Sequence, residues 1–100
     1  GVYSQEVRVS MELEGVSIKQ IINEIKLRTE FSFVYSDADL KGIENRNVVF
    51  KDATVVDILN SCLKGTGLKY SIEEKTIVIW KEFVRLEKKV EEKKFVKIEG

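Results

Sequence analysis

The chain has 100 residues, of which 43% are hydrophobic and 34% are charged, with seventeen basic and seventeen acidic side chains. This length predicts a single domain with one modest core. The zero net charge gives no long-range attraction to nucleic acid or to an anionic membrane. The absence of histidine removes the commonest general base and the commonest metal ligand. We therefore expect no enzyme, no nucleic-acid partner, no cofactor and no metal.

The first half of the chain has the pattern of a strand, a helix and a second strand. Hydrophobic and polar residues alternate over 7–13, which is typical of a half-buried strand. Ser17 and Gln20 have the spacing of a capping box, which predicts a helix over about 17–28. One face of this helix is apolar through Ile18, Ile21, Ile22 and Ile25. A second strand is predicted from the alternation of Phe31, Phe33 and Tyr35.

The second half repeats this order. The polar stretch 36–45 predicts a connection, and a third strand is expected at 46–51. Thr54 is the expected cap of a second helix, which ends near Gly65 in the left-handed position. The apolar face of that helix is Val55, Ile58, Leu59 and Cys62. Strands at 68–72 and 76–80 should form a hairpin around a turn at 73–75.

The two halves align at an offset of 37 residues. The caps Ser17 and Thr54 align, and so do the two helix faces and the strands that follow them. Val9 aligns with Arg46, so the outer strand ends are expected to differ. A repeat of this kind predicts an α+β fold of two tandem β-α-β repeats, at about 9–35 and 46–72, with the closing strand 76–80.

The ends of the chain differ from the repeats. We expect residues 1–6 to be an N-terminal lead, with Gly1 as the remnant of a tag, ahead of a domain over 7–80. Twelve of the residues in 81–100 are charged, which predicts a linker leading into a following domain. Within it, a helix face could be lined by Phe83, Leu86 and Val90. A strand could instead contain Phe95, Val96 and Ile98.

Two groups of reactive side chains have simpler structural interpretations. Cys62 could be a reactive thiol, but it continues the apolar face of the second helix and is expected in the core. Asp37 and Asp39 could be paired carboxylates, but two aspartates in a polar connection are more typical of a turn closed by their own hydrogen bonds. We therefore name no catalytic, cofactor-binding or metal-binding residue, and the partner-binding residues stay unassigned.

Two further patterns are also expected to be structural. Gly65, Thr66 and Gly67 follow a helix, whereas a phosphate-binding loop precedes one, so these residues predict a helix end. Aromatic residues on the strands could stack on nucleic-acid bases, but their spacing is that of core-facing positions: Phe31, Phe33, Tyr35 and Tyr70.

Several runs together resemble the STN domain, whose name stands for secretin and TonB N-terminus. The resemblance covers about residues 7–80 and is most specific at 64–70 (Lys-Gly-Thr-Gly-Leu-Lys-Tyr) and at 76–79 (Thr-Ile-Val-Ile). The chain looks most like the N-terminal domain of SusC-type TonB-dependent outer-membrane transporters of Bacteroidetes. One departure is Glu30, which stands where members often have glycine. A positive φ there would cost about 1 kcal/mol.

The resemblance implies a fold and a function. The fold would hold two helices between two small sheets. The function would be that of a periplasmic signalling or regulatory domain, joined to the outer membrane only through its parent transporter. Its partners would be an anti-sigma regulator and the TonB system. The alternatives are the C-terminal STN-like domain of a FecR-type anti-sigma regulator and a structural module of a secretin ring. Free sheet edges would then be the expected docking sites.

Overall fold

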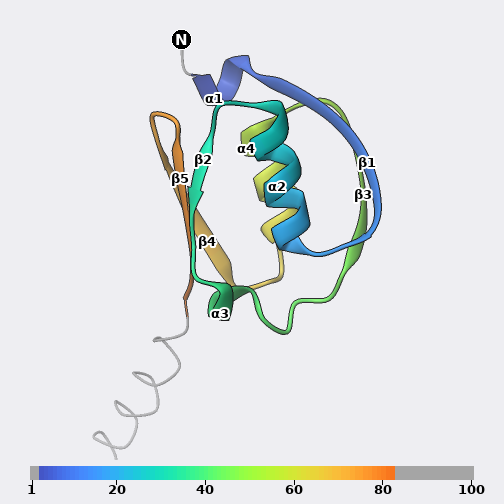
Figure 1. The fold of residues 1–100 in the computed structure, drawn as a ribbon, viewed down its shortest axis with the longest axis vertical. Helices are drawn as coiled ribbons and strands as arrows, with labels where there is room; N and C mark the ends of the chain where they lie inside the picture. The colour runs from blue at the N-terminus through green and yellow to red at the C-terminus, as the bar shows by residue number, and fades with distance from the viewer. Residues whose placement is uncertain (1–2, 83–100) are drawn as a thin grey trace, which may run out of the picture.

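The computed structural model describes residues 3–82, which form two small sheets with helices between them (Figure 1). The elements follow one another as α1 (Tyr3–Glu6), β1 (Arg8–Val16), α2 (Ile18–Arg28), β2 (Ser32–Val34), α3 (Asp37–Leu40), β3 (Arg46–Thr54), α4 (Val55–Leu63), β4 (Leu68–Glu73) and β5 (Thr76–Lys81). This order confirms the predicted α+β class. The helix and the strand expected within 83–100 lie outside the described residues.

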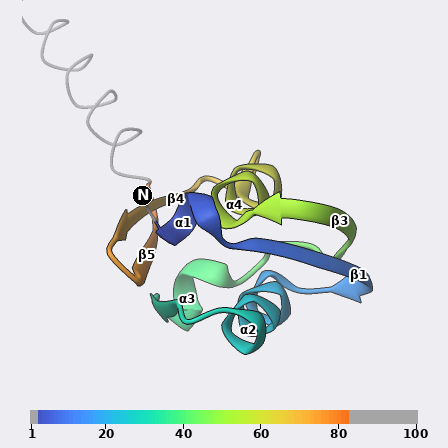
Figure 2. The same ribbon diagram turned by 90° about the horizontal axis from the view of Figure 1, so that it is seen from above.

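The two sheets differ in size and composition. β1 and β3 form an antiparallel pair. The other sheet has the strand order β2-β5-β4, in which β5 runs parallel to β2 and antiparallel to β4. Helices α2 and α4 lie between the two sheets (Figures 1 and 2). Their apolar faces form the core together with the inner face of β5, where Ile25, Ile58 and Ile77 are fully buried.

The pairing of β1 with β3 reveals an approximate two-fold relation between the repeats. Glu12 pairs with Val49, which is its own counterpart at the 37-residue offset. On either side, Met11 pairs with Phe50 and Leu13 pairs with Val48, so each repeat meets the other in the same way. This is the pattern of a two-fold interface between identical units. The sequence repeat is therefore also a geometrical one.

Both strands of this pair continue beyond their predicted ends at 13 and 51 because each contains a β-bulge. Gly15 in β1 and Asp52 in β3 have left-handed backbones, with φ of 61° and 51°. The N–H of Gly15 donates to Asn47 Oδ1 at 2.7 Å, and the N–H of Asp52 donates to Ser10 Oγ at 2.9 Å. Asp52 is the repeat counterpart of Gly15, and Asn47 is that of Ser10. The bulges are thus equivalent.

The outer strand ends are more alike than their side chains predicted. Asn45 Nδ2 donates to the carbonyl of Gly15 at 3.2 Å, and Arg8 donates to the carbonyl of Asp52 at 3.1 Å. Asn45 is the repeat counterpart of Arg8. The expected difference is found at the aligned pair itself, because Val9 is buried in the core whereas the Arg46 guanidinium donates to the carbonyl of Cys62 at 2.7 Å.

Each long helix is followed by a threonine that closes its last turn. The hydroxyl of Thr29 donates to the carbonyl of Ile25 and accepts from the N–H of Phe31, at 2.8 and 3.1 Å. The hydroxyl of Thr66 donates to the carbonyl of Leu63 and accepts from the N–H two residues later, at 2.6 and 3.1 Å.

Glu30 does not adopt a positive φ, so the cost that such a backbone would carry does not arise. Among the described residues, the only non-glycine residues with positive φ are Asp52 and Glu74. The N–H of Glu30 instead donates to the hydroxyl of Tyr3 at 2.6 Å. The left-handed residue of the 73–75 turn is Glu74, which has a φ of 58°.

Two segments expected without regular structure contain short helices. Residues 3–6 form α1, whose Tyr3 ring lies 4.9 Å from that of Phe31 between centroids. The connection 36–45 contains α3, and Asp39 in that helix accepts from the N–H of Lys81 at 3.2 Å. The prediction of a turn closed locally by Asp39 is thus wrong, because its carboxylate binds the end of β5 instead. No helix within residues 3–82 is both long and apolar enough to span a membrane.

Candidate protein-binding surface

Strand β4 forms one edge of the three-stranded sheet and is open on its outer side. The N–H of Glu82 donates to the carbonyl of Gly67 at 3.2 Å, which fixes the hydrogen-bonding phase of the β4–β5 ladder. Every second residue of β4 then exchanges backbone hydrogen bonds with β5, so the backbone N–H and C=O groups of Tyr70 and Ile72 point away from β5. Within the described residues no hydrogen bond from another segment meets these groups. They can therefore pair with a strand from another protein.

The outer face of the same sheet carries an apolar patch, which we call the outer stripe: Val34, Val78 and Trp80. Val34 on β2 pairs directly with Val78 on β5, and Trp80 follows two residues later on the same face of β5. Val34 is 55% exposed and Trp80 is 39% exposed. Tryptophan is enriched among residues that dominate protein–protein affinity. β4 is the one strand between Trp80 on β5 and the open side of the sheet. The outer stripe therefore lies one strand away from the free edge.

The outer stripe differs from the other exposed apolar residues. Val49 is 60% exposed on β3, but its cross-strand partner is Glu12. Leu27 is 79% exposed on α2, where its neighbours are Lys26 and Arg28. Single exposed apolar side chains of this kind are ordinary on protein surfaces.

The β1–β3 sheet is less suited to accept a strand, although neither of its edges pairs with another strand of residues 3–82. Each strand is bent by a bulge, and charged residues are exposed along it at Arg8, Glu12, Glu14 and Lys51. Bulges and charges on edge strands disfavour pairing with another chain. The geometry therefore favours β4 as the docking edge, which the sequence alone did not distinguish.

The side chains that were considered as reactive groups have structural roles. Cys62 is buried in the core, and this burial raises the pKa of its thiol despite the opposing charge of Arg46. Gly65 and Gly67 both have positive φ and end helix α4, as predicted. Asp37 pairs with Lys19 at 3.3 Å and lies at the surface.

The aromatic residues of the strands face the core, as their spacing predicted. Phe31 is buried, and the partly buried aromatic residues packed against the core include Phe33, Tyr35 and Tyr70. The hydroxyl of Tyr70 donates to Asn60 Oδ1 at 2.7 Å. Burial and, to a lesser extent, the charge of Asp57 raise the pKa of Tyr70. In residues 3–82, no three histidine, cysteine or acidic side chains are grouped in a way that could hold a metal ion.

The comparisons with known proteins agree with this fold. Residues 31–79 match the family model of the secretin and TonB N terminus short domain. This STN match is shorter than the 7–80 of the resemblance and begins after the first long helix. No curated protein matches the chain.

One solved structure resembles the chain over a larger share of its length. It is the solution NMR structure of the periplasmic signaling domain of the outer membrane iron transporter PupA from Pseudomonas putida. The two share 20% sequence identity at a TM-score of 0.61, over 75% of this chain and 90% of that chain. At this identity the likeness establishes the fold, which is the one predicted from the resemblance.

Proposed function

We propose that this chain is a periplasmic signalling domain of a TonB-dependent outer-membrane transporter, and that it acts by protein contact rather than catalysis. The STN match and the likeness to the PupA domain support the signalling role. The observation that carries the proposal is the free edge of β4 beside the outer stripe, since one sheet then offers both backbone groups and apolar area to a partner. The partner would be the periplasmic region of an anti-sigma regulator, and the parent a SusC-type transporter.

The proposed contact adds a partner strand to β4. The N–H and C=O groups of Tyr70 and Ile72 would pair with it, and Trp80 would be covered by side chains of the partner. A contact of this kind needs no cofactor and no nucleic acid. The parent transporter would provide the only connection to the membrane, and the periplasm would be the compartment in which partner and domain meet.

Amide exchange and NMR shifts test this contact. The chain of residues 1–100 is titrated with the periplasmic region of its cognate regulator. We expect the amides of Tyr70 and Ile72 to gain protection and the indole signal of Trp80 to shift. Trp80→Ser should weaken binding by about tenfold or more, because a large apolar contact is lost.

Leu27→Ser is the matched control, because it also removes an exposed apolar side chain but lies on α2. Its affinity should equal that of the unaltered domain. Saturating partner without any change at β4 or Trp80 would refute the docking mode, and absence of binding would refute the signalling role.

A further inference from the structure

The outer face of β4 carries one positive and one negative side chain. Lys69, Ser71 and Glu73 are exposed there, and they alternate with residues that face the helices. Lys69 forms an ion pair with Glu82 at 3.8 Å. Within residues 3–82, Glu73 takes part in no ion pair. An unpaired carboxylate and a lysine therefore lie two strand repeats apart on the open edge of the sheet.

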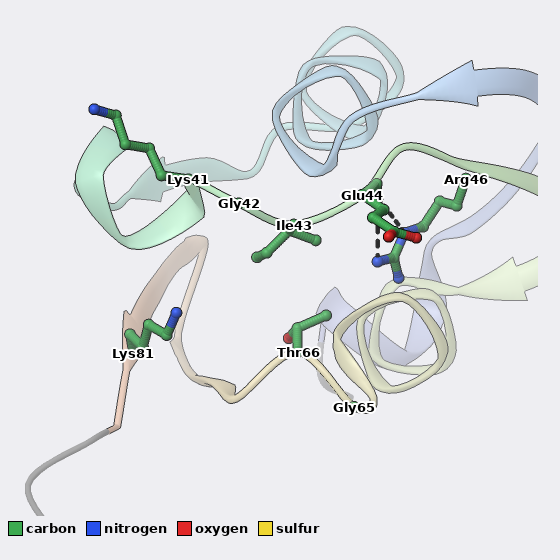
Figure 3. A pocket seen from close by; sticks show the side chains of 8 residues that line it. All are labelled: Lys41, Gly42, Ile43, Glu44, Arg46, Gly65, Thr66 and Lys81. Atoms are coloured by element: carbon green, nitrogen blue, oxygen red, sulfur yellow. Dashed lines mark hydrogen bonds between the residues drawn. The ribbon is translucent and has the colours of Figure 1, made fainter.

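The charge of Lys81, at the end of β5, belongs to the other face of this sheet. Lys81 pairs directly with Leu68, whose side chain is buried. Directly paired residues share a face. Lys81 accordingly lines a cavity of about 360 Å³ together with Ile43 and Arg46 (Figure 3). It is thus directed away from the charged side chains on the outer face of β4.

A second copy of β4 can pair with this edge as an antiparallel strand. The free backbone groups belong to Tyr70 and Ile72, so these residues would exchange hydrogen bonds across the new pair. Tyr70 opposite Ile72 places Lys69 opposite Glu73 of the other copy, and two-fold symmetry produces each contact twice. Opposite charges, and an aromatic residue facing a β-branched one, are both stabilising when they lie directly across antiparallel strands.

The neighbouring registers lack this complementarity. Tyr70 opposite Tyr70 places Lys69 opposite Ser71, which leaves the charges without partners. Ile72 opposite Ile72 places Lys69 opposite Lys75, and like charges directly opposite one another are destabilising. The distribution of charge along β4 thus favours one register and one partner strand.

From this complementarity we infer that β4 pairs with β4 of a second copy of this chain, in the register that joins Lys69 to Glu73. The dimer is weak, because the contact is limited to six-residue strands and small interfaces are typical of transient encounters. The inference goes beyond the proposed function and does not rest on it, since self-pairing needs no regulator. An edge accepts one strand at a time, so self-pairing withholds β4 from any other partner.

Sedimentation equilibrium and NMR of the chain of residues 1–100 alone test the inference. We expect a dimer with a dissociation constant of about 0.1–1 mM, the weak end of the range for specific contacts. The amides of Tyr70 and Ile72 should shift and gain protection as the concentration rises. Glu73→Lys should weaken self-association by about tenfold, because both ion pairs of the dimer become repulsive.

A mixture of two variants tests the register. Lys69→Glu alone should also weaken self-association, but mixed with Glu73→Lys it should form a heterodimer, because each glutamate then faces a lysine. Glu14→Lys is the matched control: it reverses an exposed charge on β1, and its self-association should be unchanged.

Chains that stay monomeric up to about 2 mM, well above the expected dissociation constant, would overturn the inference. So would equal effects of Glu73→Lys and Glu14→Lys, or a mixture that fails to associate. None of these results would alter the titration with the regulator, which is carried out on dilute domain, so the two proposals fail separately.

Discussion

Gly15 and Asp52 hold the same place in the two repeats and the same left-handed backbone, yet only one of them is glycine. An L side chain in this region costs about 1–2 kcal/mol, and aspartate and asparagine bear it better than most residues. A Cβ added at Gly15 would meet nothing within 4 Å. The backbone conformation, and not a lack of space for a side chain, therefore favours glycine at this position.

We expect Gly15→Ala to lower the free energy of unfolding by about 1 kcal/mol, because alanine is strained at this φ. Gly15→Asn should cost less, since asparagine tolerates the left-handed region. Urea denaturation of both variants measures the difference. Equal losses for the two would mean that side-chain packing, and not backbone conformation, decides the position.

Glu30 and Lys75 form an ion pair at the surface, where Lys75 also lies over the ring of Tyr3 at 4.8 Å. The hydrogen bond and the charge of Lys75 hold the pKa of Glu30 below 4.5, and those of Glu30 raise the pKa of Lys75. A lowered carboxylate pKa means that the folded state binds this proton less tightly than the unfolded state. The stabilisation is therefore present above pH 4.5 and is lost as pH falls through the folded pKa of Glu30.

NMR titration should place the pKa of the Glu30 carboxyl below 4.5, and Lys75→Gln should move it back toward 4.5. High salt should also move the pKa of Glu30 toward 4.5, because salt screens the charges of this exposed ion pair. Lys26→Gln is the control, since it removes an exposed charge elsewhere. A Glu30 pKa that does not respond to Lys75→Gln would contradict the assignment.

At the scale of elements, each of the long helices begins and ends with a side-chain hydroxyl. Ser17 and Thr54 accept from the N–H three residues later, at 3.2 and 3.1 Å. Thr29 and Thr66 close the last turns, and each hydroxyl accepts from the N–H two residues later. The hydroxyls thus fix both the length of the helix and the exit direction of the chain.

Thr66→Val should lower the free energy of unfolding by about 1–3 kcal/mol, because the N–H of Leu68 loses its partner and the carbonyl of Leu63 keeps only the backbone N–H of residue 66. Valine keeps the shape of threonine, so packing is preserved. Thr76→Val serves as the control, since the Thr76 hydroxyl makes one contact of 3.5 Å with Ser32. Equal urea midpoints for the two variants would show that the Thr66 bonds add no stability.

The whole molecule has one core that both sheets share. Residues from β1, α2, α4 and β5 pack together in it, so neither repeat can bury its apolar face alone. β5 breaks the two-fold relation of the repeats because it lies between β2 and β4, which are counterparts of one another. β2 and β4 therefore form the two edges of the sheet, with three and six residues.

We expect a single cooperative unfolding transition that is sensitive to substitution in either repeat. Ile25→Ala removes a fully buried side chain and should cost about 2–5 kcal/mol. Leu27→Ala, on the same helix but 79% exposed, should stay within about 0.5 kcal/mol. Calorimetry and far-ultraviolet circular dichroism measure both. Two separate transitions in Ile25→Ala would show that the repeats unfold independently.

Local patterns predicted the elements because each depends on neighbouring residues. Helix caps, apolar faces and strand alternation act over two to four positions, and the structure places them where the sequence did, with ends that differ by a few residues. The bulges at Gly15 and Asp52 lengthened both strands, and their partners lie about thirty to forty residues away, beyond the reach of local reasoning. The sequence did not predict the short helices α1 and α3, because each has a single turn and no periodic apolar face.

The sequence by itself determined the repeat, the core and the helix ends, since these follow from residue type and spacing. Only the tertiary structure decided which strands pair, and hence that β5 lies between β2 and β4. That choice leaves β4 as the long free edge and places Val34 beside Val78 on the outer stripe. It also gathers Arg46 and Lys81 around one cavity. Pairing joins residues distant in sequence, and its free energy comes from burying both sheets against the same two helices.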